Sequence, residues 1–202
     1  MVAPSKVAAR SLLNLQPVAS GVQLIGSEVN VATYFAGRLF WRMGRTLATA
    51  LSNEVLFRLQ ASAAASGNDQ WYDIHKWTSL LGKTTAIATT LSAGTTAGNT
   101  TSPYTSAASF AAGNLVYYKE GTIANGEFSR IKSISSNTIT HEEAQTRTHT
   151  SGIAVVNMAE ADSFAMDLSA ILRLRLIVDT AQNATGQTVD VEAYLNTLDS
   201  IA

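Results

Sequence analysis

Apolar and polar residues alternate with a two-residue period along several stretches of this chain, which predicts β-strands that bury one face. The period first appears over 22–31, where a glycine-serine pair turns the chain between two short strands. It is clearest over 54–64 and returns over 71–77, with a dense cluster of turn-forming residues in between. We therefore predict a hairpin over 54–79.

The second strand of this hairpin carries most of the large aromatic residues of the region. Because side chains alternate between the two faces of a strand, four polar and aromatic residues are predicted to share one face. These are Trp71, Asp73, His75 and Trp77, with Tyr72, Ile74 and Lys76 on the other face.

The segment 34–51 supports two interpretations. Apolar side chains recur every four residues from Leu39 to Leu47, as on a helix, but Gly37 and Gly44 each weaken a helix by about 1 kcal/mol. A bent pair of strands fits the same residues. The choice between helix and strand is left open.

A second compact β unit is predicted over 114–158. Asn125-Gly126 is a strong signal for a type I′ hairpin, which places strands at 116–123 and 127–134. Further elements complete a small barrel or meander: a reversal at 135–137 and strands at 138–141 and 153–156.

Residues 160–169 are predicted to form a short turn or helix. Two long alternating stretches follow at 170–178 and 187–198. The loop at 183–186 between them permits a C-terminal hairpin.

The stretch 83–113 consists almost entirely of Thr, Ser, Ala and Gly. Such a run buries too little apolar surface to offset an ordering cost of roughly 1–2 kcal/mol per residue. We expect a linker or arm that becomes ordered by lying along a neighbouring subunit. Residues 1–21, which contain Pro4 and Pro17, are expected to form an N-terminal arm.

Together these elements predict a mainly β fold: a β-sandwich, jelly-roll or immunoglobulin-like, with an inserted small β-barrel or meander module and extended arms. The expected domains are an N-terminal arm at 1–21, a sandwich at 22–82 plus 160–202, a linker or arm at 83–113, and the inserted module at 114–158.

Composition narrows the function. Charged residues are only 14% of the chain, below the roughly 25% of a typical soluble domain, which suits a surface covered by other chains. The net charge of −1 argues against nucleic-acid binding, and Arg38, Arg42 and Arg45 are better explained as a solvated or intersubunit salt-bridging face. The absence of cysteine excludes disulfides and thiolate chemistry. No apolar run approaches the length of a membrane span.

Two groups of residues are candidates for chemistry. His75 beside Asp73 resembles a metal or acid-base site, but one strand face supplies at best two ligands, so a structural histidine is favoured. Trp71 and Trp77 could stack a sugar ring or a base, or could be core or interface anchors.

The second group is His141, Glu142, Glu143 and His149, for which a solvated loop rim is favoured because adjacent strand residues point to opposite faces. The sequence contains no phosphate loop, nucleophile elbow or zinc-protease motif. We therefore expect no catalytic, cofactor-binding or metal-ligating residue and no cofactor.

One run resembles a small β module that recurs in structural proteins of tailed bacteriophages: FAAGNLVYYKEGTIANGEFSRIKSISSNTITHEEAQTRTHTSGIAVVN. The resemblance is carried by Gly113-Asn114, Glu127, a spacing strand over 131–139, and His149-Thr150-Ser151-Gly152. The C-terminal run RLRLIVDTAQNATGQTVDVEAYLNTLD is also similar to strands of such proteins. The likeness is one of pattern and composition over about half of the chain.

This resemblance implies a non-enzymatic virion protein, assembled in the cytoplasm of a host bacterium. The first expectation is a capsid decoration or cement protein that binds the outer shell, with the major capsid protein and copies of itself as partners, because arms would span between subunits. The alternatives are a neck or tail component, such as a connector, tail terminator or hub, and a carbohydrate-binding or host-adsorption module. Neither a nucleic-acid nor a membrane partner is expected.

Overall fold

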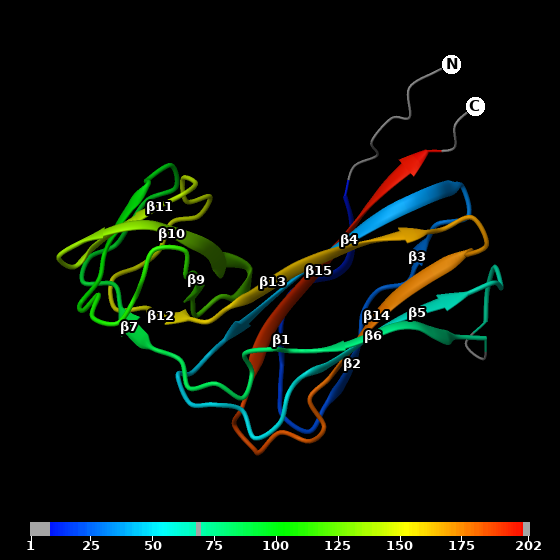
Figure 1. The fold of residues 1–202 in the computed structure, drawn as a ribbon, viewed down its shortest axis with the longest axis horizontal. Coiled ribbons are helices and arrows are strands. Elements are labelled where there is room, and N and C mark those ends of the chain that lie inside the picture. Colours follow the sequence, from blue (N-terminus) through cyan, green and yellow to red (C-terminus); the bar gives the residue numbers. More distant parts are fainter. Residues whose placement is uncertain (1–8, 68–69, 200–202) are drawn as a thin grey trace.

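The computed structural model describes residues 9–67 and 70–199 of the chain. Within these ranges it contains fifteen strands and one short 3-10 turn, arranged as a two-layer sandwich with a smaller module beside one end (Figure 1). No helix in these ranges is long and apolar enough to cross a membrane. The predicted fold class, a mainly β protein with a sandwich and an inserted barrel-like module, is confirmed.

The front sheet of the sandwich has four antiparallel strands in the order β1–β15–β4–β13. Their bounds are Arg10–Val18, Val189–Asp199, Tyr34–Arg45 and Glu160–Asp167. The back sheet has the order β2–β14–β5–β6, and β3 also pairs with β14. Its bounds are Gln23–Ile25, Arg173–Asp179, Leu56–Ser62, Tyr72–Thr78 and, for β3, Val29–Asn30.

The inward-facing side chains of the two sheets form one core, which is the usual packing of aligned sheets. In β5 this row is Phe57, Leu59 and Ala61, as the alternation predicts. The hairpin predicted over 54–79 is confirmed, because β5 and β6 pair in antiparallel fashion.

The open choice at 34–51 is settled in favour of a strand over Tyr34–Arg45. The glycines that weaken a helix here are packing positions. A Cβ on Gly37 would lie 2.9 Å from a methyl of Leu168, and one on Gly44 would lie 2.4 Å from the ring of Tyr117. Both glycines therefore allow close approach to the strand.

Residues 160–167 form the regular strand β13, so the predicted turn or helix is wrong. The small outward residues Ala161, Ser163 and Ala165 hide the alternation, since they contrast weakly with the inward Phe164 and Met166.

The predicted C-terminal hairpin is also wrong. The two strands β14 and β15 belong to different sheets, and the loop between them crosses from one layer to the other. Side chains of this loop hold it against residues 50–53: Gln187 accepts a hydrogen bond from the Ser52 N–H at 2.8 Å, and Asn183 accepts one from the Asn53 N–H at 2.9 Å.

The module is a curled sheet with the strand order β7–β12–β9–β10–β11–β8. The bounds are Ala88–Thr90, Ala154–Asn157, Leu115–Lys119, Glu127–Ser135, Thr138–His141 and Thr101–Pro103. A bridge between Leu91 and Tyr104 joins the two ends of this sheet. The predicted strand at 138–141 is confirmed, as is the reversal before it, where Ser136 has a φ of 55°.

The predicted type I′ turn at Asn125-Gly126 is not formed. Residues 123–125 make a 3-10 turn, and Gly126 has a φ of −60°, outside the left-handed region. A Cβ on Gly126 would lie 2.4 Å from the Tyr117 hydroxyl oxygen, so the glycine allows the chain to pass close to that side chain.

The stretch 83–113 is not a free linker or arm, because it supplies β7, β8 and part of the module core. Three of its few large side chains, Leu91, Tyr104 and Phe110, are buried together. Its backbone pairs with the loop near 145–149 through short hydrogen bonds, such as Gly98 N–H to the Gln145 carbonyl at 2.7 Å. Dense main-chain bonding thus compensates for the scarcity of apolar side chains.

The expected arm at 1–21 is replaced over Arg10–Val18 by β1, which pairs with β15. Two register shifts and Pro17 hide the strand period in the sequence, although Leu12, Leu13 and Val18 are buried. The rest of the expected arm up to residue 8 lies outside the described residues.

Candidate interaction surfaces

The residues singled out on β6 do not share one face. A bulge at Ile74 shifts the pairing from Leu59 with His75 to Gln60 with Asp73. As a result Trp77 faces the core and stacks on Phe57 at 5.2 Å between ring centroids. Trp71 lies on the outer face of the back sheet, where the guanidinium groups of Arg173 and Arg175 stand 4.8 and 4.2 Å from its ring.

The same bulge separates Asp73 from His75. The Asp73 carboxylate accepts a hydrogen bond from Gln60 at 2.7 Å and pairs with Lys76 at 2.8 Å on the outer face. The His75 ring lies 4.4 Å from that of Phe164 on the inner side. The two tryptophans cannot stack one sugar ring, and the pair Asp73 and His75 does not form a metal or acid-base site.

His141 is buried in the module, contrary to the expected solvated loop rim. Its Nε2 is 2.9 Å from both the Ser102 and the Tyr118 hydroxyls, and its Nδ1 is 2.9 Å from the Ser129 hydroxyl. Burial lowers the pKa of His141 to about 4. The imidazole is therefore a neutral member of a closed hydrogen-bond network.

His149 is buried next to this network and stacks on Tyr118 at 4.6 Å. Its ring nitrogens lie 2.8 Å from Glu127 and 3.2 Å from Glu120. Burial alone raises the pKa of Glu127, but the hydrogen bonds from His149 and Thr146 outweigh it and leave this pKa below its usual range. These hydrogen bonds occupy the polar atoms of Glu127 and His149 and hold the 141–150 loop in place.

Glu142 and Glu143 are exposed, and Glu142 lies 3.8 Å from Arg130. The rim interpretation therefore holds for the two glutamates and fails for the two histidines. No group of three or more His, Asp or Glu side chains within 9–67 and 70–199 is placed to hold a metal ion.

The module is joined to the sandwich through a buried contact that the sequence did not indicate. The Tyr117 hydroxyl donates to the Asp190 carboxylate at 2.7 Å, while the Tyr117 ring packs on Gly44 of the front sheet. Both side chains are buried, and burial raises the pKa of each. The two partners are 73 residues apart, so no local pattern could predict the pair.

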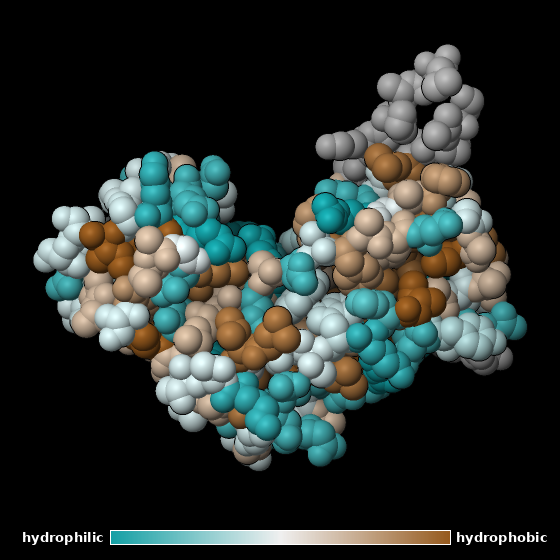
Figure 2. Space-filling view, viewed as in Figure 1, coloured by the Kyte–Doolittle hydropathy of each residue, from teal (hydrophilic) through white to brown (hydrophobic). Residues whose placement is uncertain are grey.

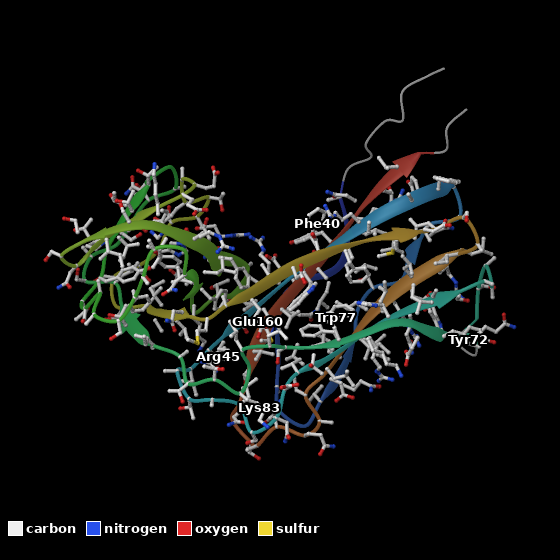
Figure 3. All side chains as sticks on the ribbon, viewed as in Figure 1. Phe40, Arg45, Tyr72, Trp77, Lys83 and Glu160 are labelled. Carbon is white, nitrogen blue, oxygen red and sulfur yellow. The ribbon has the colours of Figure 1, made fainter. Side chains whose placement is uncertain are left out.

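A second buried contact lies where the chain enters and leaves the module (Figure 3). The Arg45 guanidinium donates to the backbone carbonyls of Gly82, Leu81 and Thr84, the first at 3.0 Å. The Glu160 carboxylate accepts the N–H groups of Leu80 and Leu81 at 2.8 and 2.7 Å. Arg45 and Glu160 thus hold neighbouring backbone groups of the same loop.

The predicted cluster of three arginines is divided by the strand. Arg38 and Arg42 are exposed on the outer face of β4, whereas Arg45 is buried with 1% of its surface exposed. The helical spacing of these residues has no role in a strand.

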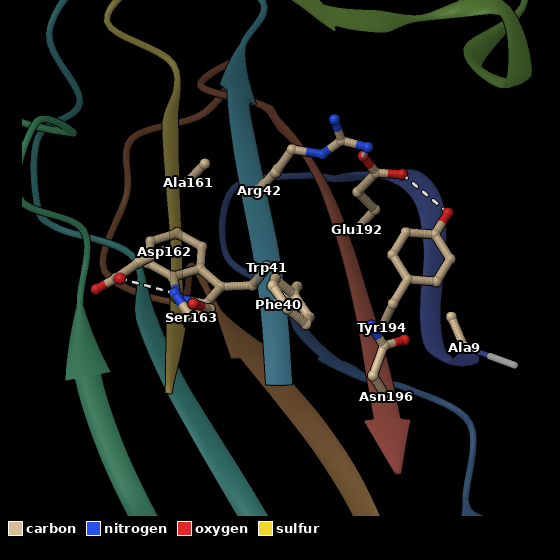
Figure 4. Close-up of a pocket in the computed structure, with 10 residues that line it drawn as sticks. All are labelled: Ala9, Phe40, Trp41, Arg42, Ala161, Asp162, Ser163, Glu192, Tyr194 and Asn196. Carbon is tan, nitrogen blue, oxygen red and sulfur yellow. Dashed lines mark hydrogen bonds and ion pairs between the residues drawn. The ribbon is translucent and has the colours of Figure 1, made fainter. Parts of the chain in front are cut away.

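The outer face of the front sheet is hollowed next to the module, and the space-filling view shows a notch between the two units (Figure 2). One groove here has a volume of about 590 Å³ and crosses β13, β4 and β15 (Figure 4). Phe40 stands in its floor with 39% of its surface exposed. Arg42 pairs with Glu192 at 2.5 Å, and Glu192 accepts a hydrogen bond from Tyr194 at 2.9 Å.

A second cleft of about 600 Å³ lies between the free edge of the sandwich and the module. Its walls include Trp77 and Phe164 from the gap between the sheets, and Leu80, which is 85% exposed. Both hollows are lined by apolar side chains and by charged side chains, most of which already bond to other groups of the protein. This lining suits contact with another polypeptide better than a bond-making reaction.

Comparison with known proteins adds little to this geometry. No protein-family model matches the chain, and no curated protein matches it. Among solved structures, the chain is similar to VP17, a capsid protein of bacteriophage P23-77, with 12% identity over 98% of this chain and 100% of that one and a TM-score of 0.20. The complex of VP16 and VP17, the two major capsid proteins of that phage, gives 14% identity over 94% and 97%, also with a TM-score of 0.20. Such a TM-score does not indicate a shared fold, so neither likeness bears on function.

Proposed function

We propose that this chain is a non-enzymatic structural protein of a bacteriophage virion, specifically a capsid decoration or cement protein that binds the outer shell and stabilises contacts between capsomers. The proposal is carried by one contrast. The histidine clusters around His141 and His149 are buried and hydrogen-bonded, while the cleft beside the module is open and more apolar than polar. Open apolar clefts of this kind suit the binding of other protein surfaces.

The virion setting comes from the sequence resemblance of residues 110–157 to a β module of tailed-phage structural proteins. Glu127 and His149, which belong to the resembling motif, bond to each other at 2.8 Å inside the module, so these motif residues hold the module together. Under this proposal the partners are the major capsid protein and further copies of this chain, and the protein acts in the assembled virion.

Two measurements test the proposal. The copy number of this chain in a purified particle should be in the hundreds, since a shell offers a site on every capsomer. Purified protein added to shells that lack it should bind and raise their resistance to heat and dilution. Binding without any gain in resistance would contradict the cement function.

A copy number of six or twelve, or closed rings formed by the purified protein with a connector, would favour the neck or tail alternative instead. The carbohydrate-binding alternative loses its main support, because Trp71 and Trp77 lie on opposite faces of the back sheet.

A further inference from the structure

The strands at the edges of the two sandwich sheets differ in how open they are to pairing. An unpaired edge is a template for another chain unless it is short, bulged or covered. In the described residues β1 has two register shifts, β6 has the bulge at Ile74, and β2 has three residues. By contrast β13 pairs with β4 over Glu160–Asp167 with no register shift.

The free side of β13 presents main-chain groups of alternate residues. The Ser163 N–H is bonded to the carboxylate of its neighbour Asp162 at 2.7 Å rather than to β4, which shows that it faces away from the sheet (Figure 4). Because these directions alternate in an antiparallel strand, the N–H and C=O groups of Ala161, Ala165 and Asp167 face the same way. The small side chains of Ala161, Ser163 and Ala165 on the outer face leave room for the outer side chains of an added strand.

The first half of β13 also borders the apolar cleft next to the module. An added strand would place one row of side chains against Phe164, Trp77 and Leu80. The module closes one end of the cleft with Gly113, Asn114 and Leu115, which would fix the register of an incoming strand.

The charges of the cleft indicate what such a strand carries. Arg130, the cation of the cleft, is near Glu142 at 3.8 Å and donates to the Gly113 carbonyl at 2.7 Å. Asp162 forms no ion pair within the described ranges, and it is exposed. A lysine or arginine of the partner would complement it.

We propose that β13 is a docking edge for an extended segment of a partner protein, which adds as a strand, alternates apolar and polar residues, and sets a lysine or arginine opposite Asp162. This inference rests on the proposed function, under which the partner is a shell subunit. The described sandwich edges of a second copy offer no equally open basic strand. Lys76 lies on the bulged β6 and is paired with Asp73, and Arg10 lies on the irregular β1 and donates to the Tyr34 hydroxyl.

The decisive variant is Ala165→Pro. Proline removes a main-chain N–H that faces the partner and keeps the ladder to β4, so the fold should persist. Loss of that bond and crowding of the new strand should weaken binding to shells about tenfold or more. The matched control is Ala165→Thr, which keeps the N–H and suits a strand. A second variant, Asp162→Asn, should weaken binding and reduce its dependence on salt.

Amide hydrogen exchange of the full chain gives the position of the contact. On shells, protection should appear at 160–167 and be lost in Ala165→Pro. A second probe is a synthetic peptide of the length of β13 with alternating valine and threonine and one central lysine, which should protect the same residues.

Four outcomes are distinguishable. Shell binding with protection elsewhere, or unchanged binding by Ala165→Pro, overturns this inference and leaves the proposed function standing. Failure to bind shells, together with peptide protection at 160–167, overturns the function and supports the edge. Failure of both probes overturns both. Protection of 160–167 that appears only as the free protein self-associates overturns the assignment to a shell subunit in favour of a second copy.

Discussion

Burial makes His141, which is hydrogen-bonded to three hydroxyl groups, sensitive to acid. In an unfolded chain the pKa of a histidine is about 6.5, whereas burial lowers the pKa of His141 in the fold to about 4. Between these values the unfolded state takes up a proton that the folded state does not bind. The folded state therefore loses stability as the pH falls through this window.

We expect the free energy of unfolding to fall by up to ~3 kcal/mol between about pH 6.5 and 4 because of His141. Urea titrations at several pH values measure this slope. Carboxylates also titrate at acid pH, so the histidine contribution is measured by comparison with His141→Gln. That variant should lose the part of the slope that is due to His141. The exposed His75→Gln is the control and should keep it. An equal slope in His141→Gln and the wild type would contradict the assignment.

Individual elements show where sequence patterns succeed. The hairpin of β5 and β6 and the strand β11 are regular, turn-bounded and clearly alternating, and they were predicted correctly. The strands β1 and β13 were missed because bulges, a proline and small residues mask the two-residue period. The face of Trp71 was predicted incorrectly because the one-residue bulge at Ile74 reverses every side chain beyond it.

The position of β1 changes what a truncation should do. Removing residues 1–18 would take the buried side chains of Leu12, Leu13 and Val18 out of the core and leave one side of β15 unpaired, so we expect loss of the folded state. Removing residues 1–8 keeps every described pair of β1 with β15, and the unfolding midpoint should stay close to that of the full chain. Circular dichroism melts of both truncations measure this. A stable fold without 1–18 would show that β1 is dispensable.

At the scale of the whole molecule, two buried contacts join the units: Tyr117 with Asp190, and Arg45 and Glu160 with the 80–84 loop. Neither contact could be predicted, since each depends on residues brought together by the finished fold. The same holds for the open hollows, which exist only between assembled sheets. The sequence did allow the prediction of the mainly β architecture.

The close contact between Gly44 and the Tyr117 ring predicts a specific effect of one added methyl group. In Gly44→Ala the new Cβ would lie 2.4 Å from the Tyr117 ring, so the ring must move away from its place beside Asp190. We expect a loss of about 1–3 kcal/mol in the free energy of unfolding. The matched control is Gly121→Ala, where nothing lies within 4 Å of the added atom. If both variants unfold alike in urea, Tyr117 does not pack as described.

Asp190 makes the sandwich depend on the module for a buried hydrogen bond. This carboxylate belongs to the front sheet, is 1% exposed, and receives its hydrogen bond from a tyrosine that the module supplies. Without the module, the Asp190 carboxylate, which is buried in the complete protein, would face solvent, and Gly44 beside it would lose the Tyr117 ring that covers it. A sandwich expressed without the module would therefore need substitutions at Gly44 and Asp190 to keep its front sheet soluble and stable.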